Sequence, residues 1–295
     1  SGTMEAIRVI EQITNEKEVN AIGYCIGGTL LASTIAVYAA RRMKSRVKSA
    51  TYLTTLLDFE YPGEIGVFIN EPVIKATEEL IDSQGYFDGR QMAVTFSLLR
   101  ENSLYWNYYI DNYLKGEEPA DFDILYWNSD STNLSSTCAK FLLRDLYLEN
   151  RLREPGAVKI GDFDIDLSKV ATPSYFLSAK DDHIALWDST FTGSNLLSGD
   201  KTLVLGESGH VAGVVNPPYK NKYGYWTSEE NFEDPEQWLA SATREAGSWW
   251  THWQQWVKPH LGEKEVPARA VGSKECPALM PAPGSYVLQT LPIEK

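Results

Sequence analysis

Eight residues near the start of the chain, Ile22–Thr29 with the sequence IGYCIGGT, decide the fold. Cys25 stands between Gly23 and Gly27, and Gly28 follows at once. A nucleophile flanked by glycines two residues away on each side is typical of a sharp strand-to-helix turn, where the nucleophile adopts a strained backbone conformation. The stretch therefore predicts that Cys25 is a nucleophile on a tight turn. The alternative interpretation is a buried, inert cysteine, because free cysteines are often simply core residues.

The residues around this turn predict the elements that the motif needs. An amphipathic helix is expected over 4–16, a short buried strand over Val19–Tyr24, a helix over 29–43 and a second buried strand over Val47–Leu57. Helix, strand, turn, helix and strand in this order are typical of an α/β protein with a parallel sheet. The N-terminus of the second helix would point backbone N–H groups at Cys25, which lowers a thiol pKa and helps to hold an oxyanion.

The composition changes after Asp58 and divides the chain into three parts. Residues 59–150 are rich in aromatic residues and show no clear alternating strand pattern, so we expect an inserted, mostly helical cap. Strand patterns return at 158–164, 173–179 and 201–205, a helical pattern at 235–261, and an extended tail from Val266. We therefore predict an α/β-hydrolase fold with a mostly parallel sheet, its core formed by residues 1–58 and 151–295.

A cysteine nucleophile requires a base, and the base requires a carboxylate that orients it. In this fold the chain order is nucleophile, acid, histidine. His210 lies on a Gly/Ser loop just past the 201–205 strand, where the base is expected, whereas His252 and His260 lie in a Trp-rich helical segment and are expected to pack. The acid should follow the 173–179 strand, and there both Asp181 and Asp182 fit, with His183 beside them as a residue that tunes the site.

Charge and cysteine usage exclude several classes of function. The net charge of −13 argues against general nucleic-acid binding, which needs a basic surface. The three cysteines form no CxxC pair and no His/Asp/Glu cluster has ligand spacing, so neither a metal nor a disulfide framework is expected. No apolar run reaches the roughly 18–20 residues of a membrane span, and a reducing, cytoplasmic setting is the default expectation.

With these residues in view, the chain resembles the polyhydroxyalkanoate synthases, and more narrowly the class I enzymes that polymerise short-chain (R)-3-hydroxyacyl-CoA. The resemblance runs from about residue 19 to the C-terminus. It rests on these stretches: GYCIGGT, LTTLLDF (53–59), YWNYYIDNYLKG (105–116), DHI (182–184) with Trp187, GESGHVAGVVNPP (206–218) and GSWWTHWQQW (247–256).

The resemblance implies the roles of the site residues. Cys25 would be the acylated nucleophile, Asp182 the triad aspartate, His210 the general base, and the backbone N–H of Ile26 an oxyanion donor. The implied substrate is a hydroxyacyl-CoA, the implied product a polyester with release of coenzyme A, and no separate cofactor is implied. Residues 59–150, with Trp106 in an aromatic motif, would form a mobile cap that contributes to a homodimer, and the enzyme would be cytoplasmic and associated with polyester granules.

The sequence departs from this family at its front. The family has an N-terminal domain and early strands before the elbow, including the loop that supplies a second oxyanion donor, and these are not in this sequence. Two rival functions are therefore kept beside the synthase: a cysteine-nucleophile thioesterase or hydrolase of the same fold, and a non-catalytic relative that acts as a binding or scaffold protein.

Overall fold

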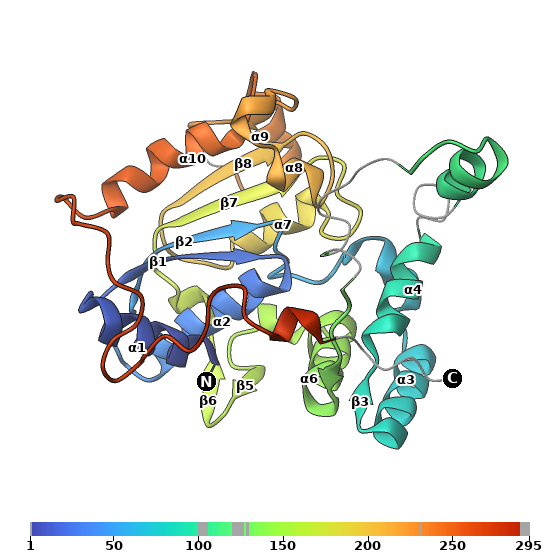
Figure 1. The fold of residues 1–295 in the computed structure, drawn as a ribbon, viewed down its shortest axis with the longest axis horizontal. Helices are drawn as coiled ribbons and strands as arrows, with labels where there is room; N and C mark the ends of the chain where they lie inside the picture. Colours follow the sequence, from blue (N-terminus) through green and yellow to red (C-terminus); the bar gives the residue numbers. More distant parts are fainter. Residues whose placement is uncertain (1, 100–105, 120–126, 128–129, 231, 290–295) are drawn as a thin grey trace.

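The chain builds a sheet with helices on both faces, shown in Figure 1. The computed structural model describes residues 2–99, 106–119, 127, 130–230 and 232–289. The first elements are helix α1 (Gly2–Thr14), strand β1 (Val19–Tyr24), helix α2 (Ile26–Ala40) and strand β2 (Val47–Leu53). This is the predicted order, and Cys25 is the one residue between β1 and α2.

The main sheet has six strands in the order β1-β2-β7-β8-β9-β10. The first four strands pair in parallel, whereas β9 and β10 at the far edge are antiparallel. Central strand β7 is buried along its whole length, as expected for a parallel strand covered on both faces. The predicted α/β-hydrolase fold with a mostly parallel sheet is confirmed. The four strands not yet bounded are β7 (Ser174–Ala179), β8 (Lys201–Gly206), β9 (Tyr225–Thr227) and β10 (Thr243–Glu245).

Alternate residues along the central strands face two separate cores. Tyr52 of β2 stacks on Phe176 of β7 in a core that helices α2 and α7 (Trp187–Ser194) cover. Their neighbours Leu53 and Tyr175 face the opposite core, which helices α8 (Ala212–Val215) and α10 (Trp249–Val257) cover. Figure 1 shows α2 and α10 on opposite sides of the sheet. The carboxyl ends of the parallel strands are thereby held rigidly from both faces.

The segment between β2 and β7 holds a helical group that lies to one side of the sheet in Figure 1. Its helices enclose a small core of their own around Ile81 and Phe87. The segment is mostly helical, and within it strand β3 (Tyr86–Phe87) pairs with β4 (Leu134–Ser135), a pairing that the sequence did not indicate. Two residues per strand are too few to leave an alternating pattern in the sequence. Its described helices include α3 (Glu71–Gln84), α4 (Gly89–Leu99), α6 (Ser136–Lys140) and the π-helices η3 (Tyr109–Leu114) and η4 (Phe141–Leu148).

Three predicted elements differ from the observed ones. The strand expected over 158–164 is a hairpin of β5 (Val158–Ile160) and β6 (Phe163–Ile165), because Gly161 turns the chain at a φ of 60°. The helix expected over 235–261 is interrupted by β10, which pairs with β9 and separates α9 (Pro235–Ser241) from α10. Strand β2 ends at Leu53 rather than Leu57, because Thr54 has a φ of 44°.

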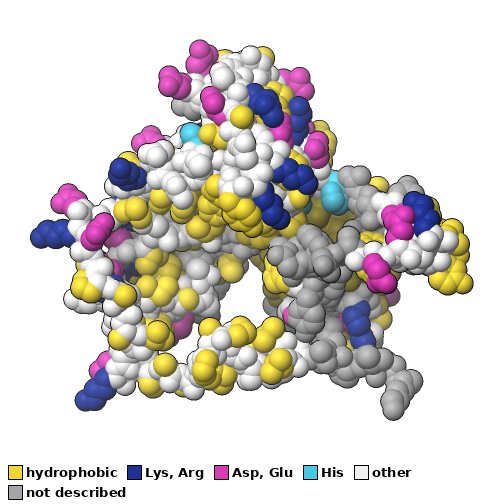
Figure 2. Space-filling model, turned by 45° about the horizontal axis from the view of Figure 1, so that its top comes forward, with side chains coloured by type: hydrophobic (Ala, Val, Ile, Leu, Met, Phe, Trp, Pro, Cys, Tyr) yellow, Lys and Arg dark blue, Asp and Glu magenta, His cyan; other side chains and the backbone are white. Residues whose placement is uncertain are grey.

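The segment after α10 runs back over the first helix. Its Arg269 side chain donates to the Thr14 carbonyl and to Glu16. Several of its apolar side chains are exposed, among them Val271 and Leu279. On the face drawn in Figure 2, hydrophobic side chains gather across the middle, whereas most acidic and basic side chains lie toward the top and the edges. Among the residues that the structure describes, no helix is long and apolar enough to cross a membrane.

Candidate active site

Cys25 occupies a strained turn at the carboxyl end of β1. Its backbone has φ 52° and ψ −126°, a conformation that non-glycine residues rarely adopt. The turn is held because the Cys25 N–H donates to the Leu53 carbonyl at 2.9 Å, and the Thr55 hydroxyl donates to the Cys25 carbonyl at 3.2 Å. Strain of this kind persists only where the surroundings impose it, and it is concentrated at functional sites.

The glycines around Cys25 do not contribute equally. A Cβ on Gly23 would overlap the backbone of Gly28, and a Cβ on Gly28 would overlap the Thr55 side chain. A Cβ on Gly27, in contrast, would meet no described atom within 4 Å. Gly27, although it belongs to the motif, is therefore not needed for the close approach of strand and helix. Gly28 has that role, because α2 brings it against both β1 and the end of β2.

Asp182 and His210 meet at the ends of β7 and β8. The Asp182 Oδ2 atom lies 2.7 Å from His210 Nδ1, and the Asp182 carboxylate is fully buried. Its Oδ1 accepts hydrogen bonds from the backbone N–H groups of Ile184 and Ala185, at 2.8 and 2.9 Å. Asp181, its neighbour, is exposed. Of the two aspartates that the sequence left open, Asp182 is the one that contacts His210.

The surroundings of His210 make its imidazole a strong base. Burial lowers its pKa, but hydrogen bonds to Asp182 and Cys25, together with their negative charges, more than offset this effect and raise the pKa from 6.5 to about 9. Because Asp182 occupies Nδ1, Nε2 is the ring nitrogen left to face Cys25. Asp182 and His210 thus form a hydrogen-bonded pair, and the effect of Cys25 on the His210 pKa places the thiol beside this pair.

Tyr24 is a contributor that the sequence analysis did not single out. Its hydroxyl donates to the His210 backbone carbonyl at 3.0 Å, and its ring lies 5.3 Å from the imidazole. Tyr24 therefore ties the elbow to the loop that carries His210. The only sequence feature that could have pointed to Tyr24 is its position in the motif, between Gly23 and Cys25.

Ile26 is the first residue of α2, so its backbone N–H has no acceptor within the helix. This N–H lies directly after Cys25 at the positive end of a 15-residue helix. The Ile26 side chain is 42% exposed, next to exposed Ile22 on edge strand β1. The Ile26 N–H is thus available to an oxyanion that forms next to Cys25, and its role as oxyanion donor remains a proposal.

With this geometry established, the chain can be compared with known proteins. A family model described as "alpha/beta hydrolase fold" matches residues 3–217. The chain belongs to the alpha/beta hydrolase fold family. Among solved structures, the DcsB complex with its substrate analogue matches with a TM-score of 0.40 and 12% identity, over 72% of this chain and 64% of that chain, a likeness too weak to add to this assignment.

Curated relatives of this α/β hydrolase are named as polymerases. The "Poly(3-hydroxyalkanoate) polymerase subunit PhaC" of Rhizobium meliloti is 47% identical over 96% of this chain and 46% of its own length. The Methylorubrum extorquens "Poly(3-hydroxyalkanoate) polymerase" is 46% identical over 97% of this chain and 47% of its own length. The "Poly(3-hydroxyalkanoate) polymerase subunit PhaC" of Cupriavidus necator is 40% identical over 97% of this chain and 49% of its own length. The resemblance to polyhydroxyalkanoate synthases is confirmed, and the chain spans about half the length of these relatives.

Cys25 of this α/β hydrolase lines a small chamber that is partly open, since Ile26 in its wall is 42% exposed. The volume of this chamber is about 10 Å³, no more than the roughly 10–15 Å³ that one water molecule needs. Its walls come from the elbow, from the chain after β2, from π-helix η4 and from the loop after Asp182. The lining residues are Cys25, Ile26, Thr29, Thr54, Leu56, Phe59, Tyr147, Ile184 and Ala185.

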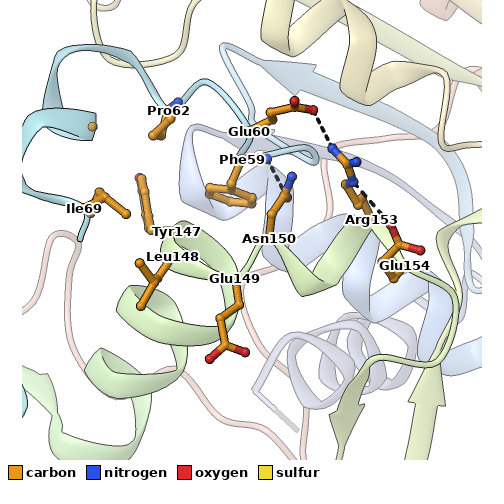
Figure 3. A pocket seen from close by; sticks show the side chains of 11 residues that line it. Phe59, Glu60, Pro62, Ile69, Tyr147, Leu148, Glu149, Asn150, Arg153 and Glu154 are labelled. Carbon is orange, nitrogen blue, oxygen red and sulfur yellow. Dashed lines mark hydrogen bonds and ion pairs between the residues drawn. The ribbon is translucent and has the colours of Figure 1, made fainter. Parts of the chain in front are cut away.

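A second cavity, of about 500 Å³, adjoins this chamber and is drawn in Figure 3. Phe59 and Tyr147 line both cavities, so this aromatic pair lies between them. The two rings meet edge to face with centroids 4.9 Å apart. Short π-helical segments such as η4, which carries Tyr147, are frequent at functional sites. The Phe59–Tyr147 pair is hereafter called the aromatic partition.

A hydrogen-bonded clasp holds the aromatic partition in place. The Asn150 side chain donates to Asp58 at 2.7 Å and accepts from the Phe59 backbone N–H at 2.8 Å. Arg153 pairs with Glu60 at 2.6 Å and with Asp58 at 3.5 Å, as Figure 3 shows in part. Asp58 and Asn150 stand at the two ends of the predicted cap. The division into 1–58, 59–150 and 151–295 stays a prediction, but the clasp joins its two boundaries.

The remaining histidines lie at the edges of the site or outside it. The backbone carbonyl of half-buried His183 accepts from the Glu64 N–H at 2.9 Å, which ties the Asp182 loop to the segment after β2, and its tuning role stays a prediction. His252 contacts the Tyr175 hydroxyl at 3.1 Å and His260 packs on Trp256, both away from Cys25. No group of three or more His, Cys, Asp or Glu able to hold a metal occurs among the described residues.

Proposed function

We propose that this chain carries the acyl-transfer site of a polyhydroxyalkanoate polymerase that consumes (R)-3-hydroxyacyl-CoA, with a preference for short acyl chains such as 3-hydroxybutyryl. The observation that carries the proposal is the hydrogen-bonded pair of Asp182 and His210 beside Cys25, which lies on a strained elbow. The names of the relatives supply the substrate class, because a polymerase of 3-hydroxyalkanoates needs activated 3-hydroxyacyl units.

The first half-reaction forms an acyl-cysteine. His210 accepts the Cys25 proton at Nε2, and the thiolate attacks the thioester carbonyl of the acyl-CoA. The oxyanion forms near the Ile26 N–H, the bond to the coenzyme A sulfur breaks, and His210 returns the proton to that sulfur. Asp182 keeps the imidazole oriented and stabilises its positive charge. Coenzyme A is therefore part of the substrate and then a product, and no separate cofactor takes part.

The second half-reaction extends the polyester. The 3-hydroxyl of another unit attacks the carbonyl of the acyl-cysteine, and His210 or Asp182 promotes its deprotonation. The new ester bond forms, the bond from the carbonyl to the Cys25 sulfur breaks, and the proton passes to that sulfur. Thioester exchange between two thiols is nearly thermoneutral, which is a reason for cysteine at this position. A serine ester would be a lower-energy resting state and would pass on its acyl group more slowly.

Water must be excluded, since otherwise the acyl-cysteine hydrolyses. The small volume of about 10 Å³ beside Cys25 and its largely apolar walls leave little room for water, which supports the polymerase over a thioesterase. A chamber this small also requires the partition to move when an acyl group enters.

We further propose, from the polymerase names of the relatives, that the active protein is a cytoplasmic homodimer formed through the cap and attached to polyester granules. Exposed aromatic side chains around η3, including Tyr109 and Tyr113, support a contact surface there. Nucleic acid is not among the expected partners, given the net charge of −13.

The test is coenzyme A release from (R)-3-hydroxybutyryl-CoA by the full natural protein, compared with its Cys25→Ala variant, with assay of the product. Cys25-dependent release with polymer supports the polymerase. Release with only free hydroxy acid supports the hydrolase. If release is absent or independent of Cys25, the acyl-transfer proposal is wrong.

A further inference from the structure

Two threonines line the Cys25 chamber, and their hydroxyls differ. Thr29 of α2 donates its hydroxyl to the Leu56 carbonyl at 2.7 Å. Thr54, which follows β2, is completely buried, and its Oγ1 has no hydrogen-bond partner among the described residues. Buried hydroxyls are nearly always paired, because leaving one unpaired costs the full penalty of its desolvation.

Thr54 also has an unfavourable backbone. Its φ of 44° lies in the left-handed region, which is a genuine outlier for a β-branched residue. The conformation is held by a hydrogen bond from the Thr54 N–H to the Leu177 carbonyl at 2.7 Å, next to the elbow. Backbone strain and an unpaired hydroxyl thus coincide on one residue beside the nucleophile. Unfavourable features of this kind persist mainly at functional sites.

Solvent is a poor partner for this hydroxyl. The chamber holds at most about one water molecule, and its other walls are largely apolar, with Leu56, Phe59 and Ile184 among them. A bound ligand that enters the chamber can supply the missing partner. The ligand group must carry a donor or acceptor a short distance from the carbon that Cys25 attacks.

We infer that the Thr54 hydroxyl binds the 3-hydroxyl of the acyl group at Cys25 and so selects 3-hydroxyacyl over plain acyl substrates. The inference rests on the acyl-transfer function proposed above. An acyl group of that class brings two polar groups into the chamber. The carbonyl oxygen has the N–H at the start of α2, whereas the 3-hydroxyl, two carbons further on, has no assigned partner until Thr54 is considered.

A hydroxyl suits this task because it can both donate and accept. The 3-hydroxyl of the substrate has the same property, so the pair can form in either direction. A plain acyl chain would leave the Thr54 hydroxyl buried and unpaired. Sites built to bind a substrate hydroxyl reject analogues that lack it for this reason.

The test combines two substrates with two matched variants in the natural protein that contains this chain. Single-turnover coenzyme A release is measured with (R)-3-hydroxybutyryl-CoA and with butyryl-CoA, for the wild type, Thr54→Val and Thr29→Val, and also for Tyr147→Phe, because Tyr147 carries another hydroxyl at the chamber wall. Valine keeps the shape and the β-branching of threonine and removes only the hydroxyl. Cys25→Ala supplies the background for both substrates.

We expect the wild type to prefer the 3-hydroxy substrate by about tenfold or more, and Thr54→Val to lose most of that preference. Thr54→Val should unfold at the same or a higher temperature, because it removes an unpaired polar group. Thr29→Val should keep the preference but unfold roughly 2–4 °C lower, because it leaves the Leu56 carbonyl without its donor.

Three outcomes would overturn the inference. Equal slowing of both substrates by Thr54→Val would assign its hydroxyl to the carbonyl oxygen instead. An unchanged preference in Thr54→Val would show that the hydroxyl does not contact the 3-hydroxyl, and loss of the preference in Tyr147→Phe alone would assign the contact to Tyr147. Failure of Cys25 to react with either substrate would instead contradict the acyl-transfer proposal, so the two failures can be told apart.

Discussion

The two sides of the Cys25 chamber are built in different ways. On the sheet side, strand ends and short loops place Cys25, Asp182 and His210 with buried hydrogen bonds to backbone and to one another. On the opposite side, the aromatic partition of Phe59 and Tyr147 closes the chamber and depends on a clasp of polar and charged groups near the surface. Under the proposed function, the sheet side would position the reacting groups, and the segment between β2 and β7 would control access to them.

The largest effect is expected at the acid, on the sheet side. Asp182→Asn should lower single-turnover coenzyme A release from (R)-3-hydroxybutyryl-CoA by about 10³–10⁴-fold, because an amide favours the wrong imidazole tautomer and cannot stabilise the imidazolium. Asp181→Asn is the matched control, since Asp181 is the exposed neighbour, and it should change the rate little. A larger loss of rate in Asp181→Asn than in Asp182→Asn would show that Asp181, not Asp182, is the acid.

The elbow glycines give the next largest effect. Gly23→Ala should lower the free energy of unfolding by about 3 kcal/mol, because its Cβ would overlap the backbone of Gly28, which cannot move without shifting α2. Gly27→Ala should be within about 0.5 kcal/mol of wild type, since its Cβ would meet open space. Denaturant unfolding of both variants measures the difference, and equal losses would contradict the described packing.

The elbow illustrates how far the sequence predicts this molecule. Cys25, Asp182 and His210 could be placed because strand ends in a parallel sheet converge, so chain order alone brings the three together. The choice of Asp182 over Asp181 came from the family resemblance, not from the pattern. The close approach at Gly28 rather than Gly27 depends on the rotation of α2, which spacing does not fix.

Other features were hidden because they depend on distant contacts. The clasp joins Asp58 to Asn150 across 92 positions, and nothing local marks either residue as its member. The interruption of the expected 235–261 helix by β10 follows from pairing with β9, which outweighs helix propensity. The unpaired Thr54 hydroxyl is a property of the folded chamber, and no pattern in LTTLLDF distinguishes it from Thr55, whose hydroxyl is paired.

The pKa of His210 predicts how stability depends on pH. Its folded-state pKa of about 9 lies above the unfolded value of 6.5, so its stabilisation is complete below pH 6.5 and is lost as the pH rises to about 9. The free energy of unfolding should therefore fall by about 2–3 kcal/mol over this range, and the fall should be absent in His210→Gln. Denaturant unfolding at pH 6, 7.5 and 9 measures both proteins.

His252 supplies a contrast of opposite sign. Burial lowers the pKa of His252, and the nearby charge of Glu245 offsets this only partly. The contribution of His252 to the free energy of unfolding therefore decreases as the pH falls below 6.5. A His252→Gln variant should thus retain the alkaline loss of stability and reduce the acidic one. If the alkaline loss disappears in His252→Gln instead, the pH dependence does not arise at the candidate active site.

The smallest expected effect tests the insertion side. Tyr147→Leu should open the aromatic partition, joining the Cys25 chamber to the adjacent cavity of about 500 Å³, and should raise the rate with 3-hydroxyoctanoyl-CoA relative to 3-hydroxybutyryl-CoA by roughly 5–10-fold. Tyr147→Phe keeps the ring and should leave the ratio unchanged. Leu148→Ala enlarges only the outer cavity and should do the same. If the ratio of the two rates responds to Leu148→Ala but not to Tyr147→Leu, the acyl chain reaches Cys25 without passing the aromatic partition. In that case the partition does not control access to the residues on the sheet side.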